Sequence, residues 1–197
     1  ANPSTAFIDV SLTQLRPVSV TVIGESNTPG PHLISGFATV LNALYASGGI
    51  KTSGSLREIK VYRNNELIKT VDLYDYITKG SLDEDIRLMN NDIIFIPSRI
   101  SSIELSGAVR NPAIFELKPI EGLDQIISFA GGLLATASLK NVAIQRIIPF
   151  RQRTENGVYD KTITSVNLSD LYQNNENYAL YDGDQVIISS ILEKVLN

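Results

Sequence analysis

Short runs of alternating hydrophobic and polar residues recur along this chain of 197 residues. Val18–Ile23 alternates as a half-buried strand does, and the turn-rich segment Gly24–Pro31 follows it. We therefore expect a strand over 18–23 and a hairpin partner near His32–Ser35. A helix should come next, because the spacing then changes to that of one helix face and Thr39 can serve as the N-cap. The expected buried line of this helix is Val40, Ala43, Leu44 and Ser47.

The segment after this helix predicts further strands. Ile59–Val71 reads as two strands around an Asn-Asn turn, and a short helical stretch is expected at Leu73–Ile77. Ile93–Ile96 is the last apolar strand, and Pro97 ends it because proline cannot donate to a strand ladder. A hairpin, a crossing helix, further strands and a final apolar strand together predict a β-grasp-like α+β unit.

The whole pattern occurs twice. Gly24 and Gly107 are 83 residues apart, and the same offset relates Ala46–Ile50 to Phe129–Leu133 and the strand ending at Arg63 to the strand ending at Arg146. The expected buried helix residues of the first repeat correspond to Leu123, Ile126, Ile127 and Ala130 in the second. Two copies of one fold are the simplest explanation of such a fixed offset.

The offset changes after residue 146, which locates the loops. Val71–Asp75 matches Val166–Asp170 at an offset of 95, so the second repeat carries 12 additional residues before Val166. Asn90–Ile96 then matches Asp182–Ile188 at an offset of 92. The additional residues include Asn156-Gly157, a strong hairpin-turn signal, and we expect an extended hairpin near 147–164.

A Gly-Gly pair follows each expected helix, at Gly48-Gly49 and at Gly131-Gly132. A glycine just past the last helical turn can adopt the left-handed conformation that satisfies the terminal carbonyl groups. A dinucleotide-binding loop would place its glycines ahead of a helix, so we expect these pairs to be helix caps.

These landmarks divide the chain. We expect a first β-grasp domain over 18–98 and a second over 102–190. Residues 1–17 contain a strand-like segment, Phe7–Leu12, without a counterpart before the second repeat, which we interpret as a strand left from a preceding module. Residues 191–197 align with the beginning of a repeat and are expected to start a third module, so the chain is interpreted as a fragment of a longer protein.

Composition excludes several classes of protein. The chain is 43% hydrophobic and 19% charged, which is ordinary for a globular protein. It has no cysteine and one histidine, so it has no disulfide, no thiol nucleophile and no multi-histidine metal site, and the redox compartment stays open. No apolar run is long enough to span a membrane. The net charge of −4 argues against nucleic acid or an anionic membrane as the main partner.

The residues that carry chemistry do not form a recognisable catalytic set. His32 lies in a turn without a partner pattern, and Asp83–Asp85 lacks the alternating oxygen ligands and glycine of a calcium loop. Nothing singles out two of the 21 carboxylates as a glycosidase pair. We therefore expect no catalytic residue, no metal site and no cofactor.

The extended hairpin is the candidate binding surface because it gathers aromatic rings and positive charge. Its candidate ligand-binding residues are Arg146, Phe150, Arg151, Arg153, Tyr159 and Lys161. Such groups suit an acidic sugar and also a neighbouring subunit, and an exposed hairpin with ordinary surface charges is the alternative. Arg57, Tyr62 and Arg63 form a second, weaker candidate set in the first repeat.

Three motifs in fixed order carry a family resemblance. These are a Gly-Glu-x-x-x-Pro-Gly turn at Gly24–Gly30, the helix end Ala-x-Gly-Gly-Ile at Ala46–Ile50, and an Asn-Asp or Gly-Asp turn before an Ile-rich strand that ends at Pro97. The chain resembles, over roughly 18–190, the soluble-ligand-binding β-grasp (SLBB) domains of Wza-type polysaccharide export outer-membrane proteins. The second repeat departs from these motifs at Ala108, Ala113 and Ser189.

The resemblance implies a non-enzymatic periplasmic piece of an outer-membrane-associated protein, with two tandem SLBB domains. It implies a scaffold that can contact the exported polysaccharide and, in the full-length protein, neighbouring subunits of a homo-oligomeric export ring. No nucleic acid partner and no membrane insertion by this fragment are expected. Related β-grasp modules bind other ligands, including cobalamin-like molecules, so the alternative is a ligand-sensing or cofactor-binding module of another secretion or uptake system.

Overall fold

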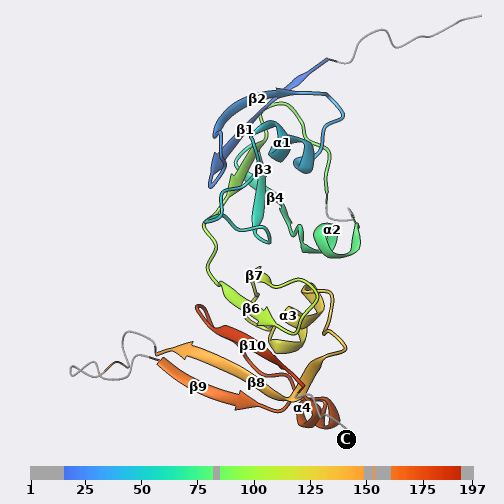
Figure 1. Ribbon diagram of the computed structural model, residues 1–197. Helices are drawn as coiled ribbons and strands as arrows, with labels where there is room; N and C mark the ends of the chain where they lie inside the picture. The colour runs from blue at the N-terminus through green and yellow to red at the C-terminus, as the bar shows by residue number, and fades with distance from the viewer. Residues whose placement is uncertain (1–15, 82–84, 149–152, 154–160, 192–197) are drawn as a thin grey trace, which may run out of the picture. The chain divides into compact units, whose positions relative to one another are not determined.

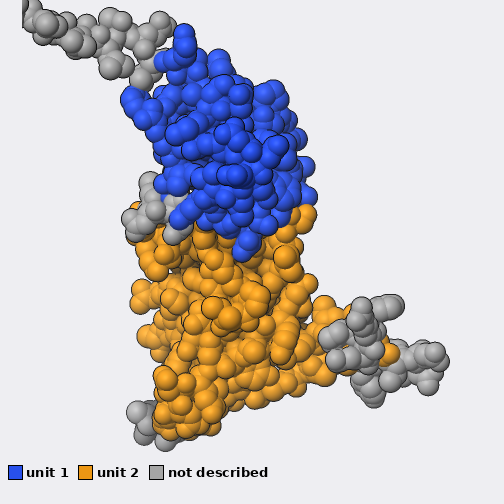
Figure 2. All heavy atoms as spheres, turned by 180° about the vertical axis from the view of Figure 1, so that it is seen from behind, with its two compact units in different colours: residues 1–54, 58–71, 83–97 blue, residues 55–57, 72–82, 98–197 orange. Residues whose placement is uncertain are grey.

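The structure is a computed structural model that describes residues 16–81, 85–148, 153 and 161–191. The chain divides into two compact units (Figure 2). Unit 1 comprises the described residues of 1–54, 58–71 and 83–97, and unit 2 comprises those of 55–57, 72–82 and 98–197.

Unit 1 contains a five-stranded mixed sheet with one helix against it (Figure 1). Its elements are β1 (Val18–Gly24), β2 (Gly30–Ile34), α1 (Val40–Ala46), β3 (Ile59–Arg63), β4 (Glu66–Val71) and β5 (Ile93–Ile96). The strand order is β2-β1-β5-β3-β4. The first and last strands of the repeat, β1 and β5, are therefore neighbours inside the sheet, and they are parallel.

The alternation seen in the sequence explains the core of unit 1. Val20 and Val22 of β1 are fully buried, while the residues between them face the other side of the sheet. The helix contributes Val40, Ala43 and Leu44 to the same core. Asn64 and Asn65 both have positive φ, as a two-residue hairpin turn between β3 and β4 requires.

Unit 2 repeats this sheet. Its elements are α2 (Tyr74–Lys79), β6 (Ile103–Gly107), β7 (Ala113–Phe115), α3 (Leu123–Phe129), β8 (Ala137–Ile147), β9 (Lys161–Val166), α4 (Leu168–Asn174) and β10 (Gln185–Ser190). The strand order β7-β6-β10-β8-β9 is that of unit 1, again with its first and last strands parallel. The predicted fold of two tandem α+β, β-grasp-like domains is confirmed.

The glycine pairs cap helices as predicted. Gly48 and Gly131 have φ of 74° and 78°. The next residue closes the cap, since the Gly49 N–H donates to the carbonyl of Leu44 at 2.8 Å and the second repeat has the same bond. The carbonyl of Gly49 then accepts from the N–H of Asn27, which fastens the β1–β2 turn to the helix end.

Gly24 and Gly107, which open the two repeats, are needed for a different reason. Both have a φ of 87°, and a Cβ atom at these positions would lie 2.0 Å and 2.1 Å from the carbonyl oxygens of Ile96 and Ile188. A side chain at either position would therefore collide with the last strand of its own repeat.

The domain division differs from the sequence repeat at two segments. Residues 55–57 and 72–82 precede residue 98, yet they belong to unit 2. The predicted strand at Phe7–Leu12 and residues 192–197 lie outside the described residues, as does the Asn156-Gly157 turn. The flanking strands β8 and β9 are antiparallel, with Ile147 opposite Lys161.

Candidate functional site

The structure describes three of the six residues predicted to bind a ligand on the hairpin of β8 and β9. Lys161 is the exposed first residue of β9, and the Arg153 Nε donates to the carbonyl of Ile148 at 2.9 Å. Phe150, Arg151 and Tyr159 lie outside the described residues. A ligand site on this hairpin stays a prediction.

Arg146, the third described member, makes a bidentate ion pair with Asp184. Its Nε lies 3.0 Å from Oδ1 and its terminal nitrogen 2.7 Å from Oδ2 of this fully buried carboxylate. The hydrogen bond to Asp184 raises the pKa of Arg146, so the guanidinium stays charged. Its carbon also lies 4.3 Å from the centre of the Tyr181 ring. Arg146 thus holds the turn before β10.

The first repeat contains the same ion pair. Arg63 donates from Nε and a terminal nitrogen to Asp92, at 2.8 Å each, and Asp92 is also fully buried. The second oxygen of Asp92 accepts from the N–H of Met89, as that of Asp184 accepts from the N–H of Tyr181. This repetition indicates a structural role that both sheets need.

Arg57 lies in a polar cluster of unit 2, although the sequence suggested a surface residue. Its side chain is buried and pairs with both oxygens of Glu121, one of them at 2.8 Å. Its Nε lies 3.0 Å from Asp72, and the guanidinium carbon lies 4.5 Å from the centre of the Tyr74 ring. Burial alone lowers the pKa of Arg57, but the hydrogen bonds to Glu121 and Asp72 outweigh it and raise the pKa.

The remaining members satisfy the other polar groups. Glu116 accepts from the Ser55 hydroxyl at 2.6 Å and from the Leu56 N–H at 2.9 Å, and its own N–H donates to the Tyr74 hydroxyl. Lys118 binds Asp72 at 2.8 Å. We name this group the Arg57 cluster: Ser55, Arg57, Asp72, Tyr74, Glu116, Lys118 and Glu121. It fastens segments 55–57 and 72–82 to the second repeat.

Two further pKa values in the Arg57 cluster are displaced. Burial alone would raise the pKa of Asp72, but the hydrogen bonds from Arg57, Lys118 and the Tyr74 N–H lower it by more than burial raises it, so the net shift is downward. Burial raises the pKa of the Tyr74 hydroxyl. The cluster is therefore a charged network stabilised at neutral pH.

The weaker candidate set from the sequence is divided between the two units. Arg57 belongs to unit 2, whereas Tyr62 and Arg63 belong to unit 1, where Arg63 is paired with Asp92. Both arginines are held in ion pairs, and a ligand site at these residues stays a prediction.

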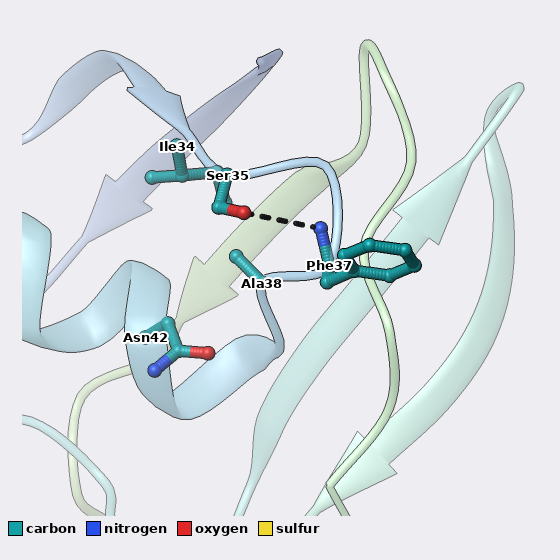
Figure 3. A pocket seen from close by; sticks show the side chains of 5 residues that line it. All are labelled: Ile34, Ser35, Phe37, Ala38 and Asn42. Atoms are coloured by element: carbon teal, nitrogen blue, oxygen red, sulfur yellow. Dashed lines mark hydrogen bonds between the residues drawn. The ribbon is translucent and has the colours of Figure 1, made fainter. Parts of the chain in front are cut away.

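Unit 1 has a surface hollow of about 360 Å³ beside the start of α1 (Figure 3). Its lining residues are Ile34, Ser35, Phe37, Ala38 and Asn42. The loop is held firmly, because Nε and a terminal nitrogen of Arg87 donate to the Gly36 carbonyl at 2.9 Å and 2.7 Å. The Arg87 guanidinium also lies 4.1 Å from the centre of the Phe37 ring. Sequence reasoning did not single out Phe37 or Asn42.

Unit 2 has a second hollow of about 390 Å³ between α2 and α3. It is lined by Thr78, Lys79, Asp124, Gln125, Ser128 and Phe129. Lys79 is paired with Asp75 at 2.9 Å, and the side-chain oxygen Oε1 of Gln125 accepts from the N–H of Gly122. Its polar side chains suit a hydroxylated ligand, although most of them already have partners in the helices.

The isolated candidates have local roles. The His32 Nε2 lies 2.9 Å from the carbonyl of Thr28 within the β1–β2 hairpin. Of the acidic group 83–85, the structure describes Asp85, which accepts from the N–H of Leu41. Among the described residues, no three His, Asp or Glu side chains are grouped to hold a metal ion. In the same part of the chain no helix has the length and apolar character to cross a bilayer.

Comparison with protein families gives two matches in the order of the repeats. Two family models, both described as SLBB domain, match residues 18–96 and 103–158. The first match ends with β5, and the second ends within the insertion between β8 and β9.

Two curated proteins of Escherichia coli, both named polysialic acid transport protein KpsD, are 31% identical to this chain over 116 residues. The match covers 58% of this chain and 21% of each relative. The chain thus matches about a fifth of the length of these relatives.

Proposed function

The chain belongs to the SLBB domain family, which it represents twice, and from this membership we propose that it is a non-enzymatic scaffold segment of a periplasmic polysaccharide export protein. In this role the two domains would form part of an outer-membrane-associated assembly. The exported polysaccharide and neighbouring subunits of a homo-oligomeric ring would be its partners.

The match to the polysialic acid transport proteins is the observation that carries this proposal. It extends over 116 residues, which is more than either repeat contains, so it includes residues of both. The similarity therefore extends beyond a single repeat, and its occurrence in a protein named for polysialic acid transport supports the same setting for this chain.

The internal charges of the described residues support a scaffold role. Arg63 and Arg146 each hold a turn through a buried aspartate, and the Arg57 cluster ties segments 55–57 and 72–82 to the second repeat. In the described part of the chain, every buried side-chain nitrogen or oxygen has a hydrogen-bond partner. A polar network in which every group has a hydrogen-bond partner makes a fold rigid, and rigidity suits a scaffold segment of an export protein.

The hairpin of β8 and β9 is proposed as a contact for exported polymer or for a neighbouring subunit. Arg151, Arg153 and Lys161 bring positive charge, and Phe150 and Tyr159 bring stacking faces. Binding of an acidic polymer there would be weak, because a conduit must release its cargo. It would also be salt-sensitive, since the Debye length is about 8 Å at physiological ionic strength.

The test is an in-frame deletion of residues 18–190 from the gene of the full-length protein. Loss of surface polysaccharide, with polymer still made inside the cell, is the expected result. As a control, Lys140→Ala in the full-length protein should leave the surface polysaccharide unchanged, because Lys140 is exposed on β8. Normal surface polysaccharide in the deletion strain would overturn the proposal.

A further inference from the structure

Part of the hollow of unit 1 corresponds by the repeat offset to residues that form ion pairs in unit 2. Ser35 and Ala38 are equivalent to Lys118 and Glu121, 83 residues later. In unit 2 Lys118 forms an ion pair with Asp72, and Glu121 forms one with Arg57. In unit 1 the same place is lined by neutral side chains and stays open to solvent. The two repeats therefore use this part of the fold differently.

An aromatic side chain, Phe37, lines the hollow of unit 1 and is 55% exposed. Tyr45 is not one of the lining residues; it is 67% exposed and lies one helical turn after Asn42 on α1. Arg87 contacts the Phe37 ring and fixes its loop, so little side-chain entropy remains to be lost when a ligand packs on the ring.

Polar groups beside the Phe37 ring are suited to hydroxyl groups. The Asn42 Oδ1 accepts from the N–H of Thr39 at 3.0 Å, which leaves the Nδ2 group of the same amide to donate. The Ser35 hydroxyl accepts from the N–H of Phe37 and can itself donate a proton. In Figure 3 the Ser35 and Asn42 side chains lie on either side of Ala38. The hollow thus combines apolar faces with two hydrogen-bonding groups.

We propose that this hollow binds a sugar ring of a saccharide, which packs on Phe37 and hydrogen-bonds to Asn42 and Ser35. A sugar ring has an apolar face of C–H groups and a rim of hydroxyls, and the hollow offers a partner for each. The lining residues are uncharged, and the Arg87 guanidinium beside the Phe37 ring already donates to the Gly36 carbonyl, so recognition should depend only weakly on the charge of the sugar and on salt. This inference rests on the proposed function, since it names a glycan contact within it.

The experiment follows backbone amide shifts of the whole chain during titration with maltotriose, a neutral trisaccharide, and with a trimer of sialic acid. We expect millimolar binding of maltotriose, with shifts in residues 33–46 that persist at high salt. Phe37→Ala should raise the Kd about tenfold, because it removes the stacking surface. Phe37→Tyr keeps a ring at this position and should retain binding.

Ile120→Ala is the matched control, because Ile120 is the equivalent of Phe37 in the second repeat and is 93% exposed. It should leave the Kd unchanged. The amide spectrum of unit 1 shows directly whether each variant is folded, and Phe37→Tyr provides a binding readout even if Phe37→Ala fails to fold.

Three results would overturn the inference: no shifts with either sugar, shifts confined to residues 146–164 and to the acidic trimer, or equal losses for Ile120→Ala and Phe37→Ala. None of them bears on the deletion experiment, so the site and the proposed export role can fail independently.

Discussion

Replacing Arg57 with methionine should destabilise unit 2 by about 3 kcal/mol. Methionine keeps the apolar stem of the side chain and removes the charge. Asp72 and Glu121 would then lose the guanidinium that binds both of them, at sites where their side chains are only 23% and 15% exposed.

The magnitude follows from the burial of the cluster. Removing one partner of a buried ion pair typically costs about 3–5 kcal/mol, because an uncompensated charge is left behind. The lower end applies here, since Lys118 still binds Asp72 and both carboxylates retain some contact with water. With a urea slope of about 2 kcal/mol/M, the midpoint should fall by about 1.5 M.

Native-state hydrogen exchange in urea measures this effect for each unit separately. Amides of β6 and β10 report on unit 2, and amides of β1 and β5 provide the internal reference. Lys140→Met is the matched control: it removes a cation at the equivalent, exposed position of the second repeat and should change stability by less than about 0.5 kcal/mol.

Adding Glu121→Gln to Arg57→Met should recover part of the loss, because it removes one of the two unpaired charges. A cost below about 1 kcal/mol for Arg57→Met, or an equal cost for Lys140→Met, would refute the argument that buried charge fastens these segments.

Three further predictions use the same unfolding measurements or simple proteolysis. Gly48→Ala and Gly131→Ala should each destabilise their unit by about 1 kcal/mol, because alanine is strained at positive φ; unchanged unfolding midpoints would contradict this. Because the pKa of Asp72 is lowered in the folded state, its ionised carboxylate stabilises the fold at pH values above the unfolded-state pKa of about 3.9. This contribution to stability is lost as the pH falls through the folded-state pKa, so below about pH 5 the wild type should lose stability more steeply than Asp72→Asn. Limited proteolysis should cut at 98–102, and the two fragments should co-elute because unit 2 contains residues from both; separate elution would contradict the division into units.

The repeat pattern was sufficient to predict the fold because it rests on local signals. Alternation in the strands, the helix line after Thr39 and the glycine pairs each depend on residues close together in the sequence. All of them occur twice at one offset, so each repeat supports the interpretation of the other. The predicted strands and caps at Val18–Ile23, Ile93–Ile96 and Gly48 are found in the structure.

The roles of the charged residues could not be predicted in the same way. Arg57 and Glu121 are 64 residues apart, and no local pattern links them. Arg146 looked like a surface cation because its partner, Asp184, is 38 residues away. One signal was available: an arginine and an aspartate occur at equivalent places in both repeats, as Arg63 with Asp92 and Arg146 with Asp184.

The Arg57 cluster also shows where the two repeats cannot replace one another. Arg57 and Asp72 are complementary in charge to Glu121 and Lys118, whereas the residues at the equivalent positions of the opposite repeats are not: Lys140 and Asn167 in the second, Ala38 and Ser35 in the first. The attachment of segments 55–57 and 72–82 within unit 2 is therefore specified by charges that the repeat pattern itself does not carry.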